Sequence, residues 1–124
     1  MTVLKRLQGL YLVVDPSIPH DKLLDIVQKA IVGGVDVLQL WSSDQKGSEI
    51  LRAAEALAKL AEQYEVPFLV NNDVTLAKHI GADGVHFDGY DITPAQVRAQ
   101  MGKKSLVGYT LGSNLDKLKW ANSA

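Results

Sequence analysis

Two segments of this chain repeat the same order of elements: a helix end, a glycine turn and a buried strand. One copy occupies 29–40 (K-A-I-V-G-G-V-D-V-L-Q-L) and the other 76–87 (L-A-K-H-I-G-A-D-G-V-H-F). A further helix begins near Leu115, and the sequence ends with it. Strands joined by helical crossovers pair in parallel. The repeat therefore predicts a parallel α/β sheet, and the unfinished third copy predicts that this sheet is incomplete.

Five apolar runs predict strands, and the segments between them predict helices. The runs lack polar–apolar alternation, which is typical of strands covered on both faces. We expect strands at 10–14, 36–41, 66–71, 83–87 and 105–109. We expect helices at 20–32, 48–64, 74–78, 94–100 and from 115 onward. This pattern fits either an open doubly wound sheet or the first part of an eightfold (β/α) barrel.

The composition is that of one soluble domain. Of the 124 residues 47% are hydrophobic and 22% are charged, so we expect a single domain over 1–124. The net charge of -1 predicts no nucleic-acid partner. No apolar stretch approaches the roughly 20 residues that cross a bilayer, and the first residues do not form a signal sequence. We therefore expect no membrane association and a cytoplasmic location. The absence of cysteine excludes disulfides and thiolate chemistry.

Polar residues follow the predicted strands at their carboxyl ends. Right-handed crossovers bring these ends to one edge of the sheet, where both candidate architectures carry their chemistry. Gln39 and Asn71 lie within otherwise apolar strands, and leaving a buried amide unpaired costs about 1–3 kcal/mol. They therefore either bind a ligand or cross-link neighbouring loops. The full set at this edge is Asp15, Gln39, Trp41, Ser43, Asn71, Asn72, Asp73, His86, Asp88, Asp91 and Thr110.

Several members of this set also have ordinary structural explanations. Asp91 and Asn72 suit a hard cation such as Mg²⁺, which prefers oxygen ligands, but loop capping explains the same pair. We expect His86 to be packed and hydrogen-bonded, and Asp73 to cap a helix. We expect Trp41 to serve packing. No G-x-G-x-x-G, Walker, zinc or Ser-His-Asp pattern occurs in the sequence.

A group of motifs, taken together and in order, resembles one enzyme family. The motifs are L-Y-L-V-V-D at 10–15, K-A-I-V-G-G-V-D-V-L-Q-L at 29–40, V-P-F-L-V-N-N-D at 66–73, G-A-D-G-V-H-F at 81–87 followed by Asp91, and L-V-G-Y-T at 106–110. Through them the chain resembles thiamine phosphate synthase over essentially its whole length. The resemblance implies a (β/α)8 barrel of the TIM type with roughly 200 residues, of which this chain holds about five of eight βα units.

The resemblance also implies a reaction. The family joins hydroxymethylpyrimidine diphosphate to thiazole phosphate with Mg²⁺ and releases pyrophosphate, so the implied partners are phosphorylated pyrimidine and thiazole molecules. Cations that clamp the departing diphosphate help the pyrimidine methylene–oxygen bond to ionise. Carried over by position, Gln39, Asn71 and Asn72 would bind substrate. Asp91 would bind the metal, and Thr110, which replaces the family's serine, would be catalytic.

Besides Thr110, three positions depart from the family pattern and one departs from that of a related branch. Trp41 and Ser43 stand where the family has Arg and Lys, so two cationic contacts to the diphosphate are lost. Asn72 replaces the first metal aspartate, which implies a weaker Mg²⁺ site. Gly112 stands where the related thiazole tautomerase branch carries a histidine, so that chemistry is not supported. Charge-assisted hydrogen bonds contribute about 1.5–3 kcal/mol each, and losing several lowers a rate by orders of magnitude.

Two functional hypotheses follow from these residues. In the first, the chain is part of a thiamine phosphate synthase-like transferase and is inactive alone. In the second, it is a non-catalytic relative that binds a phosphorylated heterocycle or self-assembles through its open sheet. Five parallel strands leave two unpaired edges, and such edges promote pairing with another chain. We therefore expect a homo-oligomer.

Overall fold

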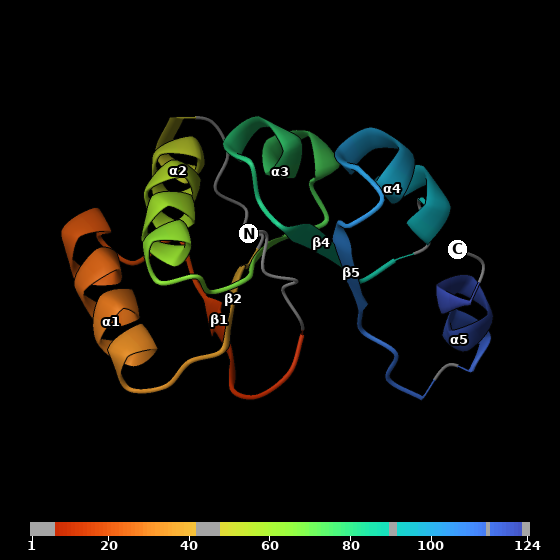
Figure 1. The fold of residues 1–124 in the computed structure, drawn as a ribbon, viewed down its shortest axis with the longest axis horizontal. Coiled ribbons are helices and arrows are strands. Elements are labelled where there is room, and N and C mark those ends of the chain that lie inside the picture. Colours follow the sequence, from red (N-terminus) through yellow and green to blue (C-terminus); the bar gives the residue numbers. More distant parts are fainter. Residues whose placement is uncertain (1–6, 42–47, 90–91, 114, 123–124) are drawn as a thin grey trace.

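The computed structural model describes residues 7–41, 48–89, 92–113 and 115–122, in which strands and helices alternate (Figure 1). In chain order the elements are β1 (Tyr11–Val14), α1 (His20–Val32), β2 (Val37–Leu40), α2 (Ser48–Gln63), β3 (Phe68–Asn71), α3 (Val74–Ile80), β4 (Gly84–Phe87), α4 (Pro94–Met101), β5 (Leu106–Tyr109) and α5 (Asp116–Ala121). None of the helices in these ranges has the length and apolar character that a bilayer crossing requires.

The strands form one parallel sheet in the order β1-β2-β3-β4-β5. Figure 1 shows α1 to α4 as an arc along the outer side of the strands, with α5 beyond β5. A doubly wound sheet reverses its strand order and carries helices on both of its faces. The observed order, with helices on one side, is that of a TIM-type barrel, which the described strands do not close. The predicted incomplete parallel barrel is therefore confirmed, and the doubly wound alternative is wrong.

Alternate residues of each strand point to opposite faces of the sheet. One face packs against the helices, and its residues, such as Leu38, Phe68 and Val85, belong to the main apolar core. We call the opposite face the inner face. Buried Val37 and Leu69 form an apolar layer on it, and polar residues follow toward the carboxyl ends of the strands. Its strand positions are Tyr11, Val13, Val37, Gln39, Leu69, Asn71, Gly84, His86, Leu106 and Gly108.

Local sequence signals place the helix ends. The side chain of Asp73 accepts a hydrogen bond from a backbone N–H in the first turn of α3 and caps that helix, as predicted. Thr93 and Gln96 form a reciprocal capping box at the start of α4. Gly81 ends α3 with a φ of 71°, a left-handed conformation that glycine adopts without a Cβ clash. Each strand begins one or two residues later than predicted, since element boundaries are weakly determined by sequence pattern.

Candidate functional site

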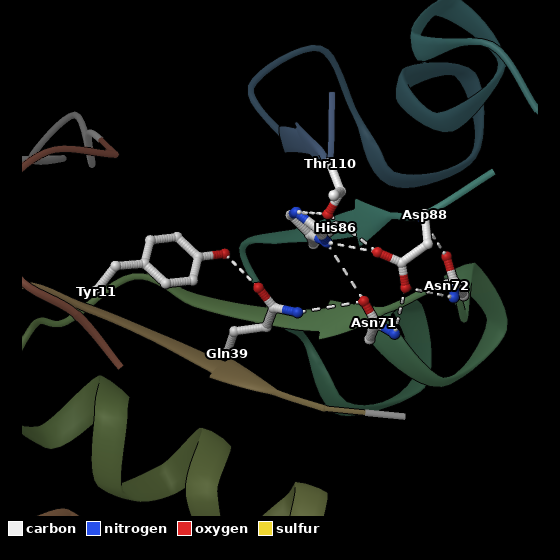
Figure 2. A network of polar contacts seen from close by, with 7 residues as sticks. All are labelled: Tyr11, Gln39, Asn71, Asn72, His86, Asp88 and Thr110. Atoms are coloured by element: carbon white, nitrogen blue, oxygen red, sulfur yellow. Dashed lines mark hydrogen bonds and ion pairs between the residues drawn. The ribbon is translucent and has the colours of Figure 1, made fainter. Parts of the chain in front are cut away.

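A connected network of side-chain hydrogen bonds runs across the inner face and joins all five described strands (Figure 2). Strands β2 to β5 contribute to this network at or near their carboxyl ends, whereas β1 contributes Tyr11, its first residue. Its members are Tyr11, Gln39, Asn71, Asn72, His86, Asp88 and Thr110. We call this set the inner-face network.

The network has a buried half on β1, β2 and β3. The hydroxyl of Tyr11 donates to Oε1 of Gln39 over 2.6 Å, and Nε2 of Gln39 donates to Oδ1 of Asn71 over 3.2 Å. Gln39 is 4% exposed and Asn71 is 3% exposed. Burial raises the pKa of Tyr11 to about 12, so its hydroxyl remains a proton donor at neutral pH. The two amides therefore cross-link neighbouring strands, one of the two roles expected for them.

Asp88 is the centre of the exposed half of the network. Its Oδ2 accepts from the side-chain amides of Asn71 and Asn72 over 3.2 Å and 3.3 Å, and its Oδ1 accepts from the hydroxyl of Thr110 over 3.0 Å. Burial raises the pKa of this carboxyl, but the three hydrogen bonds and the charge of His86 outweigh that effect and leave the pKa lowered. Asp88 is therefore ionised at neutral pH.

The backbone of Asn72 brings its side chain toward Asp88. Asn72 has a φ of 58°, and asparagine adopts this left-handed conformation more readily than most residues. Its backbone N–H donates to the carbonyl of His86 over 2.8 Å. In return, the backbone N–H of Asp88 donates to Oδ1 of Asn72 over 3.0 Å. The turn that ends β3 is thereby fastened to the turn that ends β4.

His86 lies between β3 and β5. Its Nδ1 is 3.3 Å from Oδ1 of Asn71, and its Nε2 is 3.3 Å from the hydroxyl oxygen of Thr110. Burial lowers the pKa of this imidazole, and the charge of Asp88 acts in the opposite direction. The ring lies against Gly108 of β5, where an added Cβ would be 2.8 Å from Cδ2 of His86. The packed, hydrogen-bonded histidine expected from sequence is confirmed.

Hydrogen-bond accounting determines the tautomer of His86. An ionised carboxylate only accepts, so the NH₂ group of Asn71 must face Asp88 and its Oδ1 must face His86. An acceptor at that point requires a proton on Nδ1. In the neutral ring Nε2 is then an acceptor, and it competes with Asp88 for the single hydroxyl proton of Thr110.

The structure brings together most of the site residues expected from sequence. Gln39, Asn71, Asn72 and Thr110 all belong to the inner-face network. Asp91, the expected metal ligand, lies outside the described residues, as does Ser43. Trp41 follows β2 and is 46% exposed, so the packing role expected for it stays a prediction.

Sequence reasoning missed Tyr11, and it placed Asp88 at this edge without giving it a role. The pattern around Tyr11 indicates only an apolar strand, yet its side chain lies on the same face as Gln39. Asp88 lies two residues after His86, so strand alternation carries both side chains to the inner face. That spacing is the signal in the sequence that identifies Asp88 as a member of the site.

A metal ligand set is not assembled by the described part of the chain. Within 7–41, 48–89, 92–113 and 115–122, no three His, Cys, Asp or Glu side chains gather closely enough to hold an ion. The carboxylate of Asp88 reaches Asn72, and both of its oxygens already accept hydrogen bonds. Mg²⁺ usually takes one or two carboxylates with open coordination positions. These residues alone do not fit Mg²⁺.

A cavity of about 570 Å³ lies at the opposite edge of the sheet. Glu55 and Glu62 of α2 and His79 of α3 line it, together with Asp83 just before β4. It is therefore at the amino ends of the strands, the end of a barrel that serves stability and lacks the loops that carry chemistry. The inner-face network is the better candidate for function.

The fold and the network together define the class of this protein, which has the βα-barrel type of fold. Its polar groups gather near the carboxyl ends of the strands, where barrel enzymes have their active sites. The sequence model of the family described as thiamine monophosphate synthase matches residues 10–124. The chain belongs to this family, which serves thiamine biosynthesis.

Individual relatives agree with this assignment. The chain is 36% identical over 115 residues to thiamine-phosphate synthase of Azorhizobium caulinodans, covering 92% of this chain and 54% of the relative. It is 37% identical over 112 residues to that of Leptospira biflexa, covering 90% and 53%. In fold it resembles thiamine phosphate pyrophosphorylase from Pyrococcus furiosus, with a TM-score of 0.69, 22% identity and coverage of 90% and 55%. The chain spans about half the length of the relatives that it matches.

Proposed function

We propose that this chain supplies the pyrimidine-binding part of a thiamine phosphate synthase-type site. On such a site hydroxymethylpyrimidine diphosphate is joined to thiazole phosphate, and pyrophosphate is released. The observation that carries the proposal is the inner-face network, to which β2 to β5 contribute at or near their carboxyl ends and β1 contributes Tyr11. Barrel enzymes build their active sites at this end from several strands at once.

The network suggests a division of roles. Each side-chain amide has two donors, and the bonds of Gln39 and Asn71 within the network use one donor of each. We assign the second N–H of each amide to the acceptor nitrogen atoms of a pyrimidine ring. Because both amides are buried and cross-linked, they offer a donor pair whose position is already set before the ligand arrives.

Thr110 and Asn72 lie at the exposed end of the network, and both donate to the carboxylate of Asp88. In this chain we therefore assign them to holding that carboxylate and not to a departing diphosphate. A Mg²⁺ ion would supply charge stabilisation to a diphosphate when bound. We assign its ligand to Asp91, because the part of the chain that the structure describes provides no ligand set for it.

The proposal is tested by titrating isotopically labelled chain with hydroxymethylpyrimidine and its diphosphate, each with Mg²⁺. We expect the side-chain NH₂ signals of Gln39 and Asn71 to shift, because both amides face the ligand. We also expect no thiamine phosphate when thiazole phosphate is added. The two positions that are cationic in the family hold Trp41 and Ser43, and losing two charge-assisted hydrogen bonds lowers a rate by about 10²- to 10⁴-fold.

The side-chain amide of Gln28 provides an internal control, since it lies on α1 and donates to the hydroxyl of Tyr64 away from the inner face. The Leptospira biflexa relative, assayed in parallel, validates the turnover measurement. Equal shifts at Gln28 and Gln39, or no shift at either, would contradict pyrimidine binding. Product above the no-protein background would contradict the expected inactivity.

A second candidate is a non-catalytic relative that assembles through its open sheet. It is favoured by exposed apolar side chains at the β1 edge, where Leu10 is 60% and Val13 is 51% exposed. An exposed apolar edge strand promotes pairing with another copy. We expect light scattering to give a dimer mass, and a Val13→Lys variant to shift the population toward monomer. Val32→Lys, at a 72% exposed position on α1, should leave the mass unchanged. A monomeric wild-type chain at millimolar concentration would exclude this assembly.

A further inference from the structure

We infer that Asp88 acts as a built-in anion, which makes the exposed end of the inner-face network reject phosphate groups and accept an uncharged or cationic aminopyrimidine. The inference rests on the proposed pyrimidine site and names the form of the ligand that this site takes.

Three donors of the exposed end converge on one carboxylate. The amide of Asn71, the amide of Asn72 and the hydroxyl of Thr110 reach the oxygens of Asp88 over 3.2 Å, 3.3 Å and 3.0 Å. Convergent neutral donors of this kind are how proteins commonly hold a phosphate oxygen. Here the protein's own carboxylate occupies that position. A phosphate group would have to displace Asp88 before it could use the same donors.

The charge at the exposed end of the network also disfavours binding of a phosphate group. Asp88 is 51% exposed at its side chain, in contrast to the buried amides of Gln39 and Asn71. The groups that act on this carboxyl in the described residues are three neutral donors and the half-buried His86, with no lysine or arginine among them. A diphosphate would therefore approach an anion without cationic compensation. An amino group or a protonated ring nitrogen would instead find an acceptor.

The residues around Asp88 fix its position within the fold. Its backbone N–H is held by Asn72, and its Oδ1 is 3.9 Å from Nδ1 of His86. The carboxylate is thus fixed from β3, β4 and the end of β5 at once. A carboxylate held on three sides stays among its donors and does not swing into solvent when a ligand arrives.

The test compares three probes: hydroxymethylpyrimidine, its diphosphate and inorganic pyrophosphate, each measured by calorimetry or by NMR titration. Wild-type chain should bind the pyrimidine alcohol at least about tenfold more tightly than the diphosphate. Asp88→Asn should raise the affinity for the diphosphate and for pyrophosphate by about 10- to 100-fold, the effect expected when one charge-assisted hydrogen bond forms. Asp88→Ala is a second variant, which frees the same donors without introducing a new amide.

Asp73→Asn is the matched control. It removes one negative charge at the same edge of the sheet, and asparagine still caps α3, but the donors around Asp88 are untouched. If Asp73→Asn and Asp88→Asn raise pyrophosphate binding equally, the effect is one of net charge and the inference is overturned. Tighter binding of the diphosphate than of the alcohol by wild-type chain would overturn it as well.

The probes also separate this inference from the proposed function. If pyrophosphate binds only Asp88→Asn and Asp88→Ala, the built-in anion is supported, whether or not the pyrimidine binds. Suppose that neither the alcohol nor the diphosphate binds wild-type chain or either variant, while pyrophosphate binds both variants. The proposed pyrimidine site is then wrong, and the built-in anion is supported. If pyrophosphate binds none of the three proteins, the built-in anion fails.

Discussion

Replacing Asn71 with leucine is expected to lower the free energy of unfolding by about 3 kcal/mol, because it leaves a buried donor without an acceptor. Asn71 is 3% exposed and accepts from Nε2 of Gln39, which is itself 4% exposed. Leucine is similar enough in size that the loss comes from unpaired polar groups and only slightly from a change in packing. His86 also loses the acceptor for Nδ1, and Asp88 loses one of its donors.

Urea denaturation measures this loss of stability, provided that wild type and variant show the same dependence of the unfolding free energy on urea concentration. The informative comparison is the double variant Gln39→Leu with Asn71→Leu. Replacing both partners of a buried hydrogen bond by apolar groups is far less costly than orphaning one of them. The hydroxyl of Tyr11, which Gln39 would release, belongs to a residue that is 38% exposed and can bond to water. The double variant should therefore be more stable than Asn71→Leu alone.

Asn72→Gly provides the control for a neighbouring amide. Asn72 is exposed, and its side chain donates to Oδ2 of Asp88 and accepts from the backbone N–H of the same residue. Its φ of 58° is one that glycine adopts without strain. We expect a loss of less than about 1 kcal/mol, as for a solvent-accessible hydrogen bond. If Asn71→Leu were no more damaging than Asn72→Gly, or if the double variant were the least stable of all, the buried amides would not be the cross-link that the structure describes.

The fold was largely predictable from local signals. Strand runs without alternation, glycine turns and the caps at Asp73 and Thr93 each depend on a few adjacent residues, and all are present in the structure. The choice between a doubly wound sheet and a barrel was not predictable from those signals. Strand order and the side on which each crossover passes are properties of the whole sheet, and only the family resemblance indicated the barrel.

The sequence indicated which residues belong to the candidate site, but not which of them are hydrogen-bonded to one another. Gln39 and Asn71 stood out because amides interrupt apolar strands, and Thr110 because it ends one. Their hydrogen bonds, however, join residues 15 to 32 positions apart, as in Asn71 with His86 and Gln39 with Asn71. Such contacts depend on strand register, which the sequence pattern leaves open. The central role of Asp88 follows from register and from the left-handed turn at Asn72.

Gly108→Ala is expected to disturb the same network without changing any of its polar residues. Gly108 faces His86 in the register of β4 and β5, and an added Cβ would be 2.8 Å from Cδ2 of the imidazole. The imidazole ring is packed against the sheet and cannot rotate aside as the end of a flexible side chain can. The substitution must therefore push His86 away from Asn71 and Thr110. Overpacking of this kind costs about 1–3 kcal/mol.

Thermal unfolding and nitrogen NMR of the imidazole measure the two consequences of Gly108→Ala. Wild-type chain should hold neutral His86 with its proton on Nδ1, because Oδ1 of Asn71 faces that nitrogen. The variant should lower Tm by several degrees and lose this preference, since the ring leaves its acceptor. Gly89→Ala is the matched control, because no atom lies within 4 Å of a Cβ built there. A wild-type His86 protonated on Nε2, or a Gly108→Ala variant that keeps the wild-type tautomer and Tm, would show that the ring is not held by the amide of β3. The inner-face network would then reach Thr110 through Asp88 and not through His86.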